Sequence, residues 1–128
     1  MRLLLDTHVA LWALTDNRKL SRKARALIQD PQNDIYFSAA TIWEIAIKHA
    51  LARKDMPVSA AEAQKYFIEA GYIELPFHAH HAAAVESLPG HHADPFDRIL
   101  VAQAQHEPMK LLTHDRQLIA YGQSIEFV

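Results

Sequence analysis

Short apolar runs alternate along this chain with longer amphipathic segments, and this alternation is the feature that most restricts its fold. The apolar runs have the length of strands, and the segments between them are long enough to form helices. Strands that are joined through helices pair in parallel, and the helices then cover both faces of the sheet. The sequence therefore predicts an α/β fold.

The predicted strands share a mainly apolar composition and lie at residues 2–6, 34–38, 72–75, 110–113 and 124–128. The predicted helices lie at residues 7–14, 21–30, 39–53, 59–70, 78–88, 95–106 and 115–122. Pro95 suits the first helical position, and Gly71 suits the position just after a helix end. Residues 88–94 are predicted to form a loop.

Composition excludes several kinds of site. The chain has 128 residues, which is the size of one domain, and it contains no cysteine, which excludes disulfides, thiolate zinc sites and cysteine nucleophiles. Only three glycines are present, and no glycine-rich phosphate loop is found. No apolar run is long enough to span a bilayer, so we expect a cytoplasmic location.

The formal net charge of −2 argues against a protein that coats nucleic acid along a wide basic surface. If this chain meets nucleic acid, we expect it to do so at a local site, where metal ions supply much of the positive charge. The candidate functional residues should therefore be ligands for such ions.

Two aspartates directly follow predicted strands. Asp6 follows three leucines, and Asp115 closes the segment KLLTHD. Ligands of parallel sheets bind just beyond the carboxyl ends of the strands, which favours a functional role for both residues. Each aspartate could instead be the N-cap of the helix that follows it.

Two more acids lie within predicted helices. Asp97 shares a helix face with apolar residues and is predicted to point inward, although an acid in a first helical turn also favours the helix dipole. Asp94, three residues earlier, is fully explained as an N-cap. Glu44 lies at the border of an apolar helix face and could simply pair with Lys48 at i+4.

If these four carboxylates converge, their mutual repulsion raises their pKa values, and a divalent cation would relieve it. Magnesium and manganese prefer such oxygen ligands. A bound ion lowers the pKa of a water molecule and stabilises charge on a phosphoryl oxygen, so a site built only from acids suits phosphodiester hydrolysis.

The chain resembles PIN domains over its whole length, and more narrowly the VapC-type toxins of bacterial toxin–antitoxin pairs. The resemblance is carried by LLLDTHVALW, SAATIWEIAIK, HHADPFDRILVAQA and LLTHD, in this order along the chain. It implies a single PIN domain over residues 1–128, with a three-layer α/β/α fold and a parallel sheet of about five strands.

The resemblance also implies an endoribonuclease that depends on Mg²⁺ or Mn²⁺, works as a homodimer and is covered by an antitoxin. Its catalytic residues would be Asp6, Glu44, Asp97 and Asp115. Asp6 and Asp97 would be direct metal ligands. Glu44 and Asp115 would act behind them, on a second metal, or in positioning the water.

Other polar and aromatic residues have more than one interpretation. His8 could touch substrate phosphate or pack at a helix start. The histidine pairs at 80–81 and 91–92 suggest zinc, but neighbours in sequence rarely bind one metal, and a solvated loop is the simpler prediction for His91 and His92. Arg98 and Arg116 each follow a site acid and are expected to meet substrate. The two tryptophans, Trp12 and Trp43, are expected in the core or at a dimer contact.

Two other functions remain possible at this point. Asp6 could be the nucleophile of a phosphoryl-transfer protein, although the position two residues later, where such enzymes place a second acid, holds His8. The chain could also be a binding module that keeps the fold without catalysis.

Overall fold

The computed structural model describes residues 1–128, and its centre is a five-stranded sheet in which every strand pair is parallel. The strand order is β3-β2-β1-β4-β5. The strands are β1 (Arg2–Leu5), β2 (Asp34–Ser38), β3 (Ile73–Leu75), β4 (Lys110–Thr113) and β5 (Ile125–Phe127).

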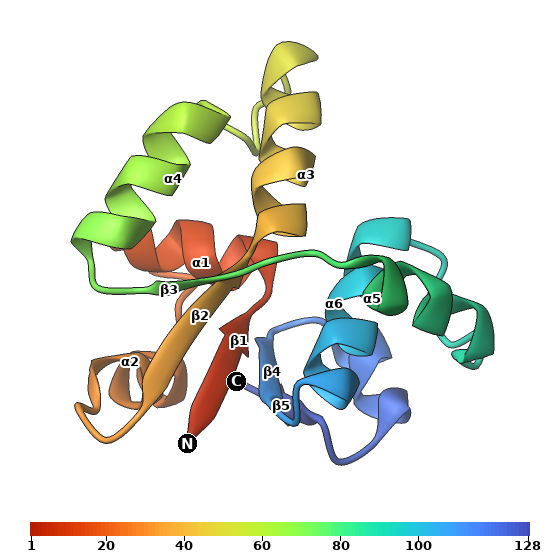
Figure 1. The fold of residues 1–128 in the computed structure, drawn as a ribbon. Helices are drawn as coiled ribbons and strands as arrows, with labels where there is room; N and C mark the ends of the chain where they lie inside the picture. The colour runs from red at the N-terminus through yellow and green to blue at the C-terminus, as the bar shows by residue number, and fades with distance from the viewer.

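Six α-helices and two short 3₁₀ helices connect the strands. The α-helices are α1 (Thr7–Leu14), α2 (Arg22–Gln29), α3 (Ala39–Ala50), α4 (Ala60–Glu69), α5 (Ala79–Ala84) and α6 (Pro95–His106). The 3₁₀ helices are η1 (Val85–Ser87) and η2 (Arg116–Tyr121). In Figure 1, α1, α2 and α4 lie on one side of the sheet, and α5 and α6 lie on the other.

The central strand β1 supplies both hydrophobic cores because its side chains alternate between the two faces of the sheet. Leu3 and Leu5 are fully buried against the core formed with α1, α2, α3 and α4. Leu4 points the other way, into the core formed with α6 and η2. The prediction of an α/β/α fold with a parallel sheet of about five strands is therefore confirmed.

Predicted helix ends differ from the observed ones in three places. Helix α3 stops at Ala50, and the positive φ of Ala52, 55°, shows that the chain has left the helical region there. The predicted helix at 78–88 divides into α5 and η1, and the one at 115–122 is the 3₁₀ helix η2. Gly71 does follow α4 with a positive φ of 88°, as predicted for the position after a helix end.

The pairing of β1 with β4 determines where the functional residues meet. Leu5 pairs with Leu112, and the N–H of Asp6 donates to the carbonyl of Leu112 at 2.9 Å. The residues that follow both strands therefore lie at one edge of the sheet, where parallel sheets bind their ligands.

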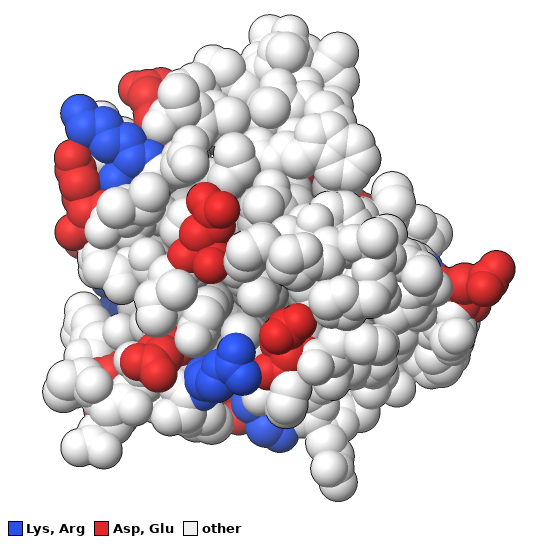
Figure 2. Space-filling model, viewed as in Figure 1, with Lys and Arg blue, Asp and Glu red and all other residues white.

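Charged side chains are scattered over the face seen in Figure 2, and acidic residues lie near the few basic ones. No helix combines the length and apolar character needed to cross a membrane.

Candidate metal centre

Asp6 lies at the junction of β1 and α1, where it is the N-cap of the helix. Its Oδ1 accepts from the N–H of His8 at 3.3 Å, and its Oδ2 accepts from the hydroxyl of Thr113 at 2.6 Å. The residue is only 5% exposed, and this burial raises the pKa of its carboxyl although both hydrogen bonds act to lower it. The N-cap and functional interpretations of Asp6 are thus compatible, because the carboxylate both caps α1 and faces the site.

Asp94 and Asp97 have separate tasks at the start of α6. Asp94 is the N-cap, and its Oδ1 accepts from the N–H groups of Phe96 at 2.8 Å and Asp97 at 3.4 Å. Pro95 occupies the first helical turn, as its fixed φ favours. Since Asp94 satisfies the helix end, Asp97 is not needed as a cap.

The carboxyl of Asp97 also has a raised pKa. Burial, which has the largest effect, and the negative charges of neighbouring acids together raise this pKa to about 8. Those neighbours, in decreasing order of effect, are Asp6, Asp94, Glu44 and Asp115. The sequence predicts that converging carboxylates raise one another's pKa values, and Asp97 shows this effect.

Asp115 joins this group through a histidine. It caps η2 by accepting from the N–H of Gln117 at 2.9 Å, and its Oδ2 lies 2.8 Å from Nε2 of His92. Because Nδ1 of His92 accepts from the N–H of Asp94 at 3.0 Å, the ring proton is on Nε2, which donates to Asp115. The same Nε2 is 3.4 Å from Oδ2 of Asp97. His92, predicted to lie in a solvated loop, is instead a member of the site.

The loop that carries His92 is held by two side chains. The guanidinium of Arg98 donates to the carbonyls of Val85, Leu88 and Pro89 and to the hydroxyl of Tyr121. That hydroxyl donates to the carbonyl of Pro89 and accepts from the N–H of His92 at 3.2 Å.

Both terminal nitrogens of Arg98 are therefore occupied by the loop and by Tyr121 and are turned away from the pocket, where the sequence led us to expect them. Arg116 also differs from expectation, since it lies over the ring of Phe127, with its guanidinium carbon 5.1 Å from the ring centre. Neither arginine lines the pocket described below.

Glu44 is buried, at 3% exposure, and takes its partners from the protein. The hydroxyl of Thr7 donates to its Oε1 at 2.7 Å, and the ammonium of Lys48 donates to its Oε2 at 2.5 Å. The i+4 pair with Lys48 foreseen from the sequence is therefore present, but as a buried pair. Glu44 lies near enough to affect the pKa of Asp97, yet it is not part of the pocket wall.

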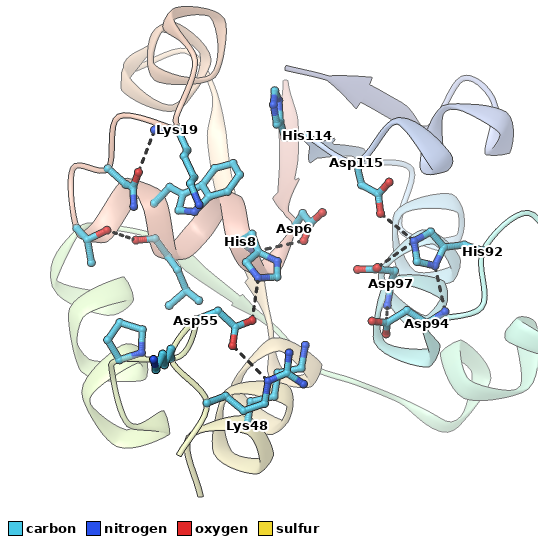
Figure 3. A pocket seen from close by; sticks show the side chains of 17 residues that line it. Asp6, His8, Lys19, Lys48, Asp55, His92, Asp94, Asp97, His114 and Asp115 are labelled. Carbon is cyan, nitrogen blue, oxygen red and sulfur yellow. Dashed lines mark hydrogen bonds and ion pairs between the residues drawn. The ribbon is translucent and has the colours of Figure 1, made fainter. Parts of the chain in front are cut away.

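A pocket of about 730 Å³ opens at this edge of the sheet. In Figure 3, Asp6 and His8 face Asp97, Asp115 and His92 across it. The remaining wall is formed by α1 and the segments after α1 and α3, and its basic residues are Lys19, Lys48, Arg53 and Lys54. Trp12, expected in the core or at a dimer contact, also lines the pocket, and Nε2 of His8 lies 3.6 Å from Asp55.

The donor set suits a hard divalent cation. Carboxylates of Asp6, Asp97 and Asp115 border one pocket, and no soft thiolate is present. Ligand atoms of Asp97, Asp115 and His92 all lie within 4.8 Å of one another. Burial is the largest cause that raises the pKa values of Asp6 and Asp97, and a bound divalent cation would favour their ionised forms.

Comparisons with known proteins agree with this architecture. The chain is similar to the structure described as VapBC2 from Rickettsia felis bound to a DNA fragment of its promoter, with a TM-score of 0.70, 14% identity and coverage of 100% of this chain and 98% of the other. A similar match is DNA-bound VapBC from Salmonella typhimurium, with a TM-score of 0.68, 15% identity and coverage of 99% and 98%. FitAcB from Neisseria gonorrhoeae matches with a TM-score of 0.60, 20% identity and coverage of 96% and 95%.

These identities are low, so the structural matches speak for the fold alone. No curated protein sequence matches the chain. The sequence model of the PIN domain, however, matches residues 3–123, which is nearly the whole chain. The chain therefore belongs to the PIN-domain family, as its motifs predicted.

Proposed function

We propose that this protein is a metal-dependent endoribonuclease that hydrolyses RNA phosphodiester bonds and serves as the toxin of a toxin–antitoxin pair. The observation that carries the proposal is the meeting of Asp6, Asp97 and Asp115 at one pocket, from three segments far apart in sequence. No cysteine is present, and the acids at the pocket have no serine beside them as an alternative nucleophile.

In this proposal Asp6 and Asp97 are the direct ligands of Mg²⁺ or Mn²⁺. Such an ion, when bound, supplies a water of lowered pKa and stabilises charge on the phosphoryl oxygens. Thr113 orients Asp6 through its hydroxyl, and His92 orients Asp115 through its Nε2–H. Asp115 positions the attacking water, and Glu44 acts from behind the pocket wall through Thr7 and Lys48.

The proposed partners follow from the relatives and from the surface. The VapBC and FitAcB structures named above are complexes, and by analogy we propose an antitoxin, a homodimer and a cytoplasmic location for this chain. Exposed apolar side chains on α4, on α3 and just after α3 support a protein partner because soluble monomers rarely expose large apolar patches. They are Trp43, Ile47, Leu51, Tyr66 and Ile68.

The first experiment is RNA cleavage by the antitoxin-free protein, with Mg²⁺ or Mn²⁺ and with a chelator in parallel. Asp6→Asn and Asp97→Asn each remove a charged ligand while keeping the side-chain shape. We expect cleavage to stop with chelator and to fall by about a thousandfold or more in each variant, because the ion contributes several kcal/mol to transition-state stabilisation.

Asp34→Asn is the matched control. This exposed residue begins β2, at the opposite edge of the sheet, and its replacement should leave the rate unchanged. Cleavage that persists in both ligand variants would refute the site. Absence of both manganese binding and RNA cleavage would favour the binding module, whereas manganese binding without cleavage would point to a narrow RNA substrate. A trapped aspartyl-phosphate on Asp6 would favour phosphoryl transfer.

A further inference from the structure

A second group of metal-ligand side chains gathers where α5 packs against the end of α6, which lie next to each other in Figure 1. This α5–α6 histidine cluster consists of His78, His80, His81, His106 and Glu107. The ring of His80 lies 4.2 Å from that of His81 and 6.1 Å from that of His106, centre to centre.

The cluster is separate from the carboxylate pocket. Asp97 is in the first turn of α6, and His106 is its last residue, which places them roughly 14 Å apart along the helix axis at 1.5 Å per residue. None of the cluster residues lines the pocket. The proposed nuclease activity therefore leaves the cluster unexplained.

His81 has a positioning role within the cluster. It is fully buried, and its Nδ1 accepts from the N–H of His78 at 3.0 Å. Its proton is therefore on Nε2, which donates to Oε2 of Glu107 at 2.7 Å. A buried imidazole thus fixes one carboxylate oxygen of Glu107, which leaves the other oxygen free to bind an ion. Hydrogen bonding of this kind commonly orients metal-binding carboxylates.

His106 and His80 provide the nitrogen donors. Nδ1 of His106 donates to the carbonyl of Ala102 at 3.2 Å, so its exposed Nε2 carries a lone pair. This backbone bond is the usual arrangement for a histidine that binds metal. His80 is also exposed, and its Nε2 lies 3.6 Å from Oε2 of Glu107.

Ligand atoms of His80, His81 and Glu107 lie within 4.8 Å of one another, and the ring of His106 borders this group at a spacing close to that of two imidazoles on one ion. Two imidazoles on one tetrahedral zinc, with Zn–N of about 2 Å, hold their ring centres roughly 5–6 Å apart. The centres of His80 and His106 are 6.1 Å apart. The C-terminus of α6, where Glu107 is the C-cap, carries the negative end of the helix dipole and favours a cation.

We propose that His80, His106 and Glu107 form a second divalent-metal site, with His81 holding Glu107 in position. Two imidazoles and one carboxylate favour zinc and its neighbours over Mg²⁺ and Mn²⁺, which prefer all-oxygen ligands. Three protein ligands leave a fourth position for water or for a ligand from another molecule. A bound ion ties α5 to the end of α6.

The test is calorimetric titration of Zn²⁺ into the full chain without a histidine tag, in excess Mg²⁺ to occupy the carboxylate centre. His80→Asn and His106→Asn each remove one donor from the surface. We expect a single zinc equivalent in the unmodified protein and a loss of affinity of roughly tenfold or more in each variant.

His49→Asn is the matched control, because His49 is exposed and its Nδ1 bonds the carbonyl of Met56 just as His106 bonds that of Ala102. The His49→Asn variant should bind zinc with the same affinity as the unmodified protein. In parallel, zinc should raise the Tm of the unmodified protein and of His49→Asn but not that of a variant lacking both His80 and His106.

Three results would overturn the proposal. The unmodified protein could fail to bind zinc, or it could bind with an affinity that neither substitution changes. Zinc binding that disappears in Asp97→Asn but persists in His80→Asn and His106→Asn would assign the ion to the carboxylate centre. Because the readout is zinc binding, it is independent of whether the protein cleaves RNA.

Discussion

Each carboxylate near the pocket has a different partner, and the partner determines what the carboxylate can do. Asp6 accepts a hydroxyl, Asp115 accepts an imidazole N–H, and Glu44 has a full positive charge at 2.5 Å. Asp97 has only a distant contact to His92, at 3.4 Å, and its pKa is raised to about 8 by burial and by neighbouring acids. Charge is thus balanced at Glu44 and left unbalanced at Asp97, which favours Asp97 as the residue that receives a cation.

The pairing of Glu44 with Lys48 gives a prediction about stability. In Lys48→Met, the carboxylate of Glu44 stays buried without its counter-charge, and we expect the free energy of unfolding to fall by about 3 kcal/mol. Urea denaturation measures this change. Adding Glu44→Gln to Lys48→Met should restore much of the loss because the unpaired charge is then removed.

Lys19→Met is the control for Lys48→Met, since Lys19 also lines the pocket but is exposed and forms no ion pair with an acid. Its effect on stability should stay within about 0.5 kcal/mol. A loss below about 1 kcal/mol in Lys48→Met would show that water reaches Glu44 and that the pair is effectively a surface pair.

At the scale of elements, the loop between η1 and α6 is held in place by side chains from two neighbouring elements. Tyr121 belongs to η2, yet its hydroxyl bonds Pro89, His92 and Arg98. Tyr121 of η2 and Arg98 of α6 therefore both hold the loop. This support is what keeps His92 beside Asp115.

Tyr121→Phe removes those three hydrogen bonds without creating a cavity. We expect the free energy of local opening measured by hydrogen exchange at residues 88–94 to fall by about 1–3 kcal/mol, because the N–H of His92 is left unpaired. RNA cleavage should fall at the same time, since Asp115 loses its fixed donor.

Tyr72→Phe is the comparison for this variant, because Tyr72 is half-buried and its hydroxyl makes no hydrogen bond within the protein. Its substitution should leave both exchange and cleavage unchanged. Normal exchange of residues 88–94 in Tyr121→Phe would mean that Arg98 alone holds the loop.

The helices and loops also show which residues of the site can be predicted from the sequence and which cannot. The sequence predicts Asp6 and Asp115 at the carboxyl edge of the sheet because each follows an apolar strand, and Asp97 near them because it lies on the inward face of an amphipathic helix. The structure does bring the three to one pocket. His92 could not be found in this way, because its position depends on Tyr121, 29 residues away in sequence. Arg98 was assigned to substrate because of its neighbour Asp97, but its side chain turns to backbone carbonyls of the preceding loop.

At the scale of the whole molecule, positive charge is local. The net charge is −2, and the basic residues of the pocket are Lys19, Lys48, Arg53 and Lys54. Two of these are already paired, Lys48 with Glu44 and Arg53 with Asp55. The pocket therefore has few unpaired cations with which to bind phosphates.

This distribution predicts a weak dependence of RNA binding on salt. Each phosphate contact with a single strand contributes about −0.7 to the slope of log affinity against log salt, so at most four contacts give a slope no steeper than about −3. The measurement uses Asp97→Asn, which should bind without cutting, with single-stranded RNA over a range of KCl concentrations. A much steeper slope would reveal a basic surface beyond the pocket, whereas Lys19→Met should make the slope shallower by about one contact.

The fold class and the sheet were predictable at this scale, but the strand order was not. Apolar runs such as residues 2–6 and 110–113 identify buried parallel strands through their composition. The composition of these runs does not indicate that β1 pairs with both β2 and β4, because pairing between distant strands depends on packing of the whole chain.

The pairing of β1 with β4 has a consequence for synthesis on the ribosome. The hydroxyl of Thr113 reaches Asp6 across 107 positions of sequence, and β1 cannot have both of its neighbours until β4 has emerged. A nascent chain that ends before this point carries Asp6 and Glu44 but lacks Thr113 and Asp115. Incomplete translation products therefore cannot assemble the proposed metal site, which is completed only when nearly the entire chain has been made.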